Sequence, residues 1–337
     1  MPGVKIRAFD DVLERTSGVA RHLLLGNGFS IDYDRRFSYG ALAHVAASLP
    51  GTPITPELRA ATDGVADFET LARYLTLAAR LTDLYGKDEH ELVSTLERTA
   101  ERVRLALVDT IMSVMPESGD RLETAEIRSA RAFLAKFTSV YTLNYDLLLY
   151  WVAVKRSGNY GPCPAMDGFR GTEDLRWGRE NPAEIFYLHG ALHLFDEDGD
   201  VRKVKHQKGR RLAEQIADHI REGSYPLVVT EGTSLRKQVR IKESRYLRHA
   251  HKRLARVQGA LFVHGASMDD KDAHVFDRIA SANSQVSALY VGLHGDEDDG
   301  INRDTVKAAR ALQRTRAQTK HPLKLGFYDT RSAHVWR

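Results

Sequence analysis

His22-Leu23-Leu24-Leu25-Gly26-Asn27-Gly28-Phe29-Ser30, near the N-terminus, is the segment from which the architecture can be inferred. A short apolar run that ends at closely spaced glycines predicts a buried β-strand entering a tight turn. Gly26 and Gly28 would let the backbone approach a phosphate closely, and a helix beginning there would favour an anion. The Rossmann dinucleotide pattern has a third glycine where this chain has Ile31. The segment therefore predicts an incomplete phosphate-binding turn, although a plain strand-to-helix turn would have the same sequence.

Segments with strand and helix patterns alternate from residue 137 onward. Strands are predicted at 139–143, 185–188, 226–230, 260–264, 286–293 and 323–328. Helices are predicted at 145–154, 243–256, 270–282 and 303–316, and Asp198-Gly199 marks a hairpin within 192–204. This alternation is typical of a parallel sheet with helices on both faces. We therefore predict an α/β fold with a Rossmann-like parallel sheet.

A different pattern precedes residue 137. Apolar residues recur at helical spacing in three groups, which begin near Phe68, Leu92 and Ile127, with charged residues between them. This periodicity predicts three amphipathic helices. We interpret 55–136 as a helical insertion into a Rossmann-like domain that is formed by 1–54 and 137–337.

The composition is that of an ordinary globular protein. Of 337 residues, 42% are hydrophobic and 28% are charged, and the formal net charge is only +4. The single cysteine, Cys163, excludes an internal disulfide and any zinc site with three or four cysteines from one chain. No apolar run reaches the ~20 residues that a membrane-spanning helix needs, and the first residues do not resemble a secretory signal. We therefore expect a cytoplasmic protein without zinc and without membrane attachment.

Polar residues follow several of the predicted strands. Asn144 and Asp146 follow one strand, His189 follows the next, and Gly265 with Ser267 follows a later one. Open parallel sheets bind ligands beyond the carboxyl ends of their strands, and a histidine there can transfer protons near neutral pH. Helix capping, turn formation or a surface histidine would explain each position separately. Their common position favours a nucleotide site along one edge of the sheet.

The order of these motifs resembles that of the sirtuin-like NAD-binding fold. The matching segments are Gly26-Asn27-Gly28-Phe29-Ser30, Leu143-Asn144-Tyr145-Asp146, Leu188-His189-Gly190 and Gly265-Ala266-Ser267. With Phe68-Glu69 opening the helical region, they look most like the bacterial branch whose members degrade NAD in anti-phage defence. The resemblance spans roughly residues 20–330 and depends on order and spacing, because each motif is short.

The resemblance implies a role for each matched residue. Asn144 would lie at the nicotinamide ribose, and His189 would be the catalytic histidine. The residues implied to bind NAD are Gly26, Asn27, Gly28, Ser30, Asp146, Gly265 and Ser267. Sirtuin deacylases have an alanine at the position of Asn27 and also carry four zinc cysteines. The resemblance therefore does not extend to deacylation.

The implied activity is that of an NAD+ glycohydrolase, which releases nicotinamide and ADP-ribose. A freely active enzyme of this kind would be toxic to its own cell. We therefore expect activation by a partner protein, such as a sensor or an ATPase, or by assembly of a homo-oligomer through the helical insertion. NAD and NADP remain open as substrates, as do hydrolysis, cyclisation and ADP-ribosyl transfer as reactions.

Two other functions are compatible with the same sequence. A non-catalytic sensor of NAD or ADP-ribose would use the same turns. Basic residues gather in 202–211 and 236–256, where they would either contact a nucleic acid or form solvated helix faces. We expect nucleic acid to be an indirect partner only. His249 and His251 are two residues apart, hence on different faces of a helix, and no metal site is predicted.

Overall fold

The computed structural model describes residues 4–62, 68–116, 121–155, 160–172, 175–205, 207, 210–222, 224–229, 233–296 and 298–337. The chain divides into two units. The first comprises Met1–Tyr33, Pro116–Val229 and Thr233–Arg337, and the second comprises Asp34–Met115 and Thr230–Gly232. Among the described helices, none combines the length and the apolar character needed to cross a membrane.

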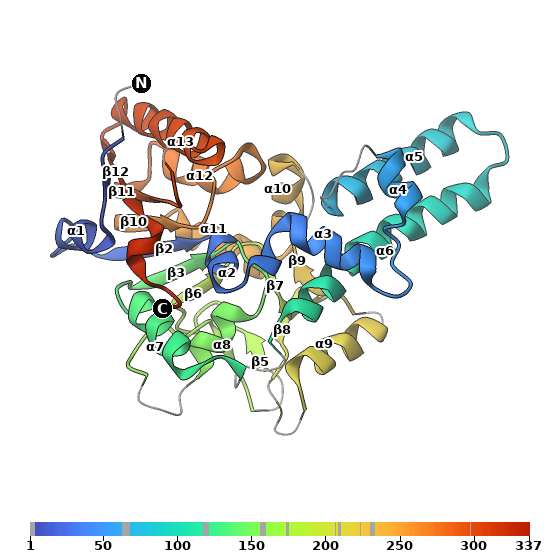
Figure 1. Ribbon diagram of the computed structural model, residues 1–337, viewed down its shortest axis with the longest axis horizontal. Helices are drawn as coiled ribbons and strands as arrows, with labels where there is room; N and C mark the ends of the chain where they lie inside the picture. The colour runs from blue at the N-terminus through green and yellow to red at the C-terminus, as the bar shows by residue number, and fades with distance from the viewer. Residues whose placement is uncertain are drawn as a thin grey trace. The chain divides into compact units, whose positions relative to one another are not determined.

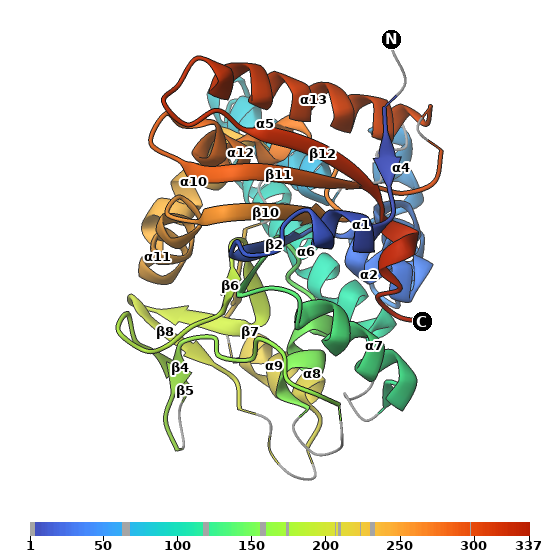
Figure 2. The ribbon, with the colours of Figure 1, turned by 90° about the vertical axis from the view of Figure 1, so that its left-hand side faces the viewer.

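The first unit contains a seven-stranded sheet in which all neighbouring strands are parallel (Figure 2). From one edge to the other, the strands are β1 (Ile6–Arg7), β12 (Lys324–Asp329), β11 (Gln285–Leu293), β10 (Gln258–His264), β2 (Arg21–Leu25), β3 (Ser139–Thr142) and β6 (Ile185–Tyr187). When the six strands from β2 onward are numbered along the chain and read from the β6 edge, their order is 3-2-1-4-5-6, which is the Rossmann order. The predicted Rossmann-like parallel sheet is therefore confirmed.

The strand order reverses between β2 and β10, which are adjacent and in register from Arg21 opposite Ala260 to Leu25 opposite His264. In doubly wound sheets, the crevice beyond the carboxyl ends of such a pair is where ligands bind. The glycine segment after β2 and the turn after β10 therefore meet at the point where this fold forms its binding crevice.

Successive side chains of the apolar central strands point to opposite faces of this sheet, so both faces are apolar and both are covered by helices. Leu261 and Val263 of β10 belong to a buried cluster with apolar residues of three helices on one face. These helices are α11 (Arg245–Leu254), α12 (Ala273–Ala280) and α13 (Gly300–Ala317). Phe262 lies on the other face, where its ring packs against Phe9 of α1 (Phe9–Glu14) at 6.0 Å. Phe9 in turn contacts Phe133 of α7 (Thr124–Leu134).

A second sheet in the same unit is antiparallel, and it was not predicted. Its strands, in spatial order, are β4 (Phe169–Arg170), β5 (Leu175–Trp177), β8 (Asp200–Lys203), β7 (Gly190–Glu197) and β9 (Pro226–Val228). The predicted hairpin is confirmed as β7 and β8, and its turn residues Asp198 and Gly199 both have positive φ, 53° and 86°. The strand expected at 226–230 is a correction: β9 pairs with β7 here rather than joining the parallel sheet. The pattern of apolar residues in a segment predicts that the segment forms a strand, but it does not predict which other strand it pairs with.

The remaining helices of the first unit connect these strands. They are α2 (Gly28–Tyr33), α8 (Leu148–Val154), α9 (Leu212–Arg221) and α10 (Ser234–Glu243). Residues 230–232, which follow β9, lie outside the described residues, and Ser234 begins α10.

The second unit is helical. Its helices are α3 (Tyr39–Ser48), α4 (Pro56–Ala61), α5 (Phe68–Tyr85) and α6 (His90–Val114). The two longest, α5 and α6, pack side by side (Figure 1). This unit overlaps the insertion predicted at 55–136, whereas α7 belongs with the first unit. The domain boundaries that we inferred from sequence stay a prediction.

Candidate functional site

Two glycine turns cross at the reversal of strand order. Gly26 N donates to the carbonyl of His264 at 2.9 Å, and Gly28 N donates to the carbonyl of Gly265 at 2.8 Å. A Cβ on Gly28 would lie 2.5 Å from Gly265 Cα, and one on Gly265 would lie 2.7 Å from Gly28 Cα. Gly265 also has a φ of +73°. Backbone packing between the two turns therefore requires glycine at both positions.

Replacing Gly265 with alanine is expected to destabilise the protein more than the same change at Gly18. Both glycines have left-handed φ values, +73° and +82°, but a Cβ at Gly18 meets nothing within 4 Å. The left-handed conformation alone costs a residue with a Cβ about 1–2 kcal/mol, and only Gly265→Ala adds a clash with backbone atoms. Urea unfolding of both variants, followed by circular dichroism, measures the difference. Equal losses of unfolding free energy would show that the crossing opens to accept a methyl group.

A buried polar chain joins the turn after β2 to the turn after β3. Asn144 Nδ2 donates to Ser30 Oγ at 3.0 Å, and Ser30 Oγ donates to Asp146 Oδ2 at 2.6 Å. The other carboxylate oxygen of Asp146 accepts from Leu148 N at 2.9 Å and so holds the first turn of α8. Burial raises the pKa of the Asp146 carboxyl, and the hydrogen bond from Ser30 opposes that shift. Asn144, Ser30 and Asp146 thus form one connected unit at the carboxyl edge of the sheet.

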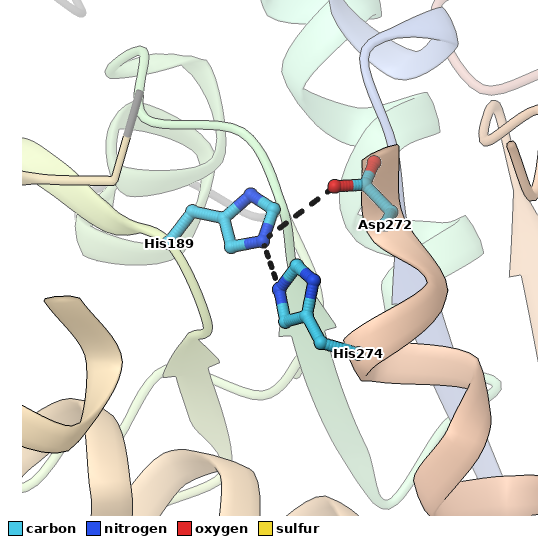
Figure 3. Close-up of side chains that lie close together, drawn as sticks. All are labelled: His189, Asp272 and His274. Carbon is cyan, nitrogen blue, oxygen red and sulfur yellow. Dashed lines mark hydrogen bonds and ion pairs between the residues drawn. The ribbon is translucent and has the colours of Figure 1, made fainter. Parts of the chain in front are cut away.

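His189 follows β6 and contacts the helix that follows β10. Its Nε2 lies 3.0 Å from Nε2 of His274 on α12 and 3.8 Å from Oδ1 of Asp272 (Figure 3). Lys237 of α10 is buried and places its Nζ 3.0 Å from the same Asp272 oxygen. Burial, followed by the charge of Lys237, holds the pKa of His189 well below its usual value and lowers that of His274 to about 3. Both imidazoles are therefore neutral at pH 7.

The hydrogen bonds assign the tautomers of the two imidazoles. The backbone of Leu143 favours a proton on the His189 ring, and because Nε2 faces His274, we infer that Nδ1 carries this proton. Nε2 of His189 then accepts from Nε2–H of His274. Nδ1 of His274 in turn accepts from the Ser234 hydroxyl at 3.2 Å, while Ser234 Oγ accepts from the backbone N of His274 at 2.8 Å. His274 and Ser234 therefore orient the basic nitrogen of His189.

The same residues have the composition of a metal site. His189, Asp272 and His274 each offer a ligand atom, and these atoms lie within 4.8 Å of one another. The ammonium of Lys237 already contacts the Asp272 carboxylate, and a positive charge there disfavours a metal cation. We therefore describe the group as a hydrogen-bonded network, and the absence of a metal stays a prediction.

Several buried histidines make the fold acid-sensitive. Burial lowers the pKa of His251 to about 3, that of His264 to about 4 and that of His274 to about 3. In the unfolded chain each binds a proton near pH 6.5, so their stabilising effect is complete above that pH and is lost as the pH falls towards the folded values.

We therefore expect the unfolding free energy to fall steeply below pH 6.5, by up to about 1.4 kcal/mol per pH unit for each of the three histidines. Urea midpoints between pH 7.5 and 5.0 measure this slope. His193 offers a comparison, because it is fully buried and neither ring nitrogen has a hydrogen-bond partner among the described residues. Burial also holds the pKa of His193 well below its usual value, so this ring adds to the slope and His193→Leu should make it shallower. A urea midpoint that does not change with pH would contradict the conclusion that these rings are buried in their neutral form.

The structure brings most of the predicted site residues together. Gly26, Gly28 and Gly265 meet at the crossing, the group of Asn144, Ser30 and Asp146 ties β2 to β3, and His189 is tied to the β10 side by His274. The Asn27 carbonyl accepts from the backbone of Ser30 and Ile31, at the first turn of α2.

One predicted residue lies apart from this group, and three others were missed. Ser267 is exposed, and its hydroxyl donates to Asp269 at 3.4 Å rather than to a site residue. Lys237 and His274 were not predicted, and Ser234 was interpreted only as part of a polar turn that could contact a ribose or start a helix. Lys237 was counted in the basic run at 236–256, where nothing in the sequence separates a buried lysine from a solvated one.

Comparison with known proteins gives one family match. A family model described as "Domain of unknown function (DUF4917)" matches residues 23–336. No curated protein matches the sequence. A Sir2 homologue mutant in complex with 2'-O-acetyl ADP ribose aligns over 90% of this chain and 97% of its own, with 11% identity and a TM-score of 0.34. A complex of a Sir2 homologue with NAD aligns over 92% and 97%, with the same identity and TM-score. At these values nothing about the site follows from the two proteins.

Proposed function

We propose that this chain, which belongs to the DUF4917 family, binds NAD+ and hydrolyses the bond between nicotinamide and ribose. The observation that carries the proposal is the convergence of four turns at the carboxyl edge of a sheet with Rossmann strand order. They bring the glycine crossing, the Asn144 carboxamide and the neutral His189 to one edge. The motif order described above is the second support.

The reaction requires little acid catalysis. The nicotinamide ring is a pyridinium, so it leaves as a neutral molecule with the bonding electron pair, and the ribose develops oxocarbenium character. Water then forms the new bond to the anomeric carbon. One proton of that water goes to Nε2 of His189, which carries the lone pair in the assigned tautomer. When substrate binds, Nε2 of His189 must give up the hydrogen bond that it accepts from His274 and accept one from this water instead.

Asn144 is suited to hold the ribose or the attacking water. The residue is 8% exposed and its carboxamide is fixed through Ser30 to the buried Asp146, so its orientation is set before substrate arrives. A polar group that needs no reorientation stabilises a developing charge more effectively than a mobile one.

We further propose that activity depends on assembly, and that the biological role is that of an effector in bacterial anti-phage defence. Support for assembly comes from α5 of the second unit. Large apolar side chains along it are exposed at helical spacing: Leu77 by 53%, Leu81 by 48% and Leu84 by 70%. Such a row on one helix is typical of a surface that another chain covers. The defence role is supported by the resemblance in motif order alone.

The test is the consumption of NAD+ by the purified protein over a range of protein concentrations. Chromatographic detection of nicotinamide and ADP-ribose in equal amounts would support hydrolysis, and a specific activity that rises with protein concentration would support assembly. Calorimetric binding of NAD+ without products would instead favour the sensor function. The absence of both NAD+ binding and NAD+ turnover at every protein concentration would contradict the proposal.

A further inference from the structure

A separate cavity lies near the amino ends of the parallel strands. It is a cavity of about 520 Å³ between α11 and Trp177 of β5. α11, which lines it, ends just before β10 begins, whereas the candidate NAD site follows the last residue of β10 (Figure 2). A strand of seven residues is about 20 Å long. The two sites are therefore separated by roughly the length of β10.

Positive charge dominates this cavity. Five exposed cationic side chains from α11 and its C-terminal end line it: Arg245, Arg248, Lys252, Arg253 and Arg256. Within the described part of the chain, no ion pair neutralises any of the five. The one carboxylate in the lining, Glu180, lies 3.8 Å from a sixth cation, Arg179. The cavity therefore holds an uncompensated positive charge.

The other basic run of the sequence shows that such charge is usually neutralised in this fold. Lys203 pairs with Asp167, Arg210 pairs with Asp218, and Arg202 lies 3.3 Å from both Glu197 and Asp200. Lys237, from the second basic run, is buried against Asp272. Among the described residues of that run, those at the cavity carry charges without an ion-pair partner, while Arg248 donates to the Lys242 carbonyl and Arg253 lies over the Phe186 ring.

The spacing of the cations suits a row of phosphates. Arg245, Arg248 and Lys252 recur every three or four residues, so they lie on one face of α11, and Arg256 follows in the turn after the helix. At 1.5 Å per residue the helical part of this row is about 10 Å long. Guanidinium groups bind phosphate oxygens in pairs, and a row of them can bind successive phosphates.

An aromatic wall completes the cavity. The half-buried Trp177 ring is held edge-on by Tyr246 at 5.7 Å and by His249 at 5.3 Å. Burial and the nearby Arg253 and Arg179 lower the pKa of His249, so this ring is uncharged at neutral pH. Two aromatic rings of fixed orientation next to cations are the arrangement that proteins use to stack nucleobases.

We propose that this cavity binds a nucleobase that carries two or more phosphates, independently of the NAD site. Its volume suits a ligand of nucleotide size. The phosphates lie along the arginines and the lysine of α11, and the base lies against Trp177. A free nucleotide and an unpaired end of a nucleic acid strand share this chemistry.

The experiment is a calorimetric titration at 50 and 200 mM salt with three probes: ATP, inorganic triphosphate and a single-stranded decanucleotide. Arg248→Ala and Lys252→Ala should each weaken ATP binding about tenfold, because each removes a charged hydrogen-bond donor. Trp177→Ala should weaken ATP and the decanucleotide but leave triphosphate unchanged. The matched control is Arg240→Ala, an exposed arginine of the same basic run that already pairs with Glu243 at 3.0 Å.

The outcomes separate the two sources and the two sites. If the decanucleotide binds more tightly than ATP, and Arg248→Ala and Lys252→Ala weaken this binding, the ligand is a nucleic acid strand. If ATP binds more tightly than the decanucleotide, and the same variants weaken its binding, the ligand is a free nucleotide. No binding of either at 50 mM salt overturns the proposal. ATP binding that Asn144→Ala abolishes and Arg248→Ala leaves unchanged would place ATP in the NAD site and would also overturn it. Because the α11 variants leave the NAD site intact, NAD+ turnover provides an independent check of their folding.

Discussion

His189→Ala is expected to lower the rate of NAD+ cleavage by roughly 10²–10⁴-fold, the usual effect of losing a general base. His189 is 3% exposed, and burial and Lys237 keep its imidazole neutral, which is the form that accepts a proton. Loss of the ring also leaves His274 without its acceptor. The measurement is the turnover number for nicotinamide release, with the unfolding midpoint determined in parallel.

A matched variant separates catalysis from packing in this experiment. His193 lies four residues further along the chain, is fully buried, and has no hydrogen-bond partner for either ring nitrogen among the described residues. His193→Leu replaces it with an apolar side chain, a change that is close to neutral when no hydrogen bond is lost. We expect His193→Leu to retain wild-type turnover. A folded His189→Ala protein with turnover equal to that of His193→Leu would exclude His189 as the base.

The parts of the fold that could be predicted are those that depend on local sequence. The run from His22 to Leu25 is apolar because β2 is central in the sheet, and the glycines after it are required where two turns cross. Asn144 and His189 could be singled out as candidates because a polar residue directly after a buried strand of a parallel sheet lies at the edge where such sheets bind ligands.

The parts that could not be predicted depend on contacts between distant segments. The pairing of β9 with β7 requires Gly190 to have a φ of +74° and to approach the Leu227 carbonyl so closely that a Cβ would clash with it. His274 contacts His189 across 85 positions of sequence, and Lys237 reaches Asp272 across 35. No periodicity within one segment carries this information, so the residues that orient the predicted base became evident only in three dimensions.

Asn144→Ala is expected to lower turnover by roughly 10²–10³-fold, as when one preoriented polar contact is removed from an active site. It should also cost about 1 kcal/mol of unfolding free energy, because Ser30 Oγ loses a donor. The two effects are separated by Asn302→Ala. Asn302 is also a buried asparagine, and its Nδ2 donates to the carbonyls of His294 and Asp296.

Because Asn302→Ala removes two hydrogen bonds, it should destabilise the protein at least as much as Asn144→Ala while leaving turnover unchanged. Turnover numbers and KM for NAD+, measured well below the unfolding midpoint of each variant, compare the two. If Asn144 serves only to brace Ser30 and Asp146, both variants will lose stability and neither will lose turnover. A loss of turnover confined to Asn144→Ala, with KM nearly unchanged, would instead mean that its carboxamide acts on the transition state, since a contact made equally to bound substrate would have raised KM.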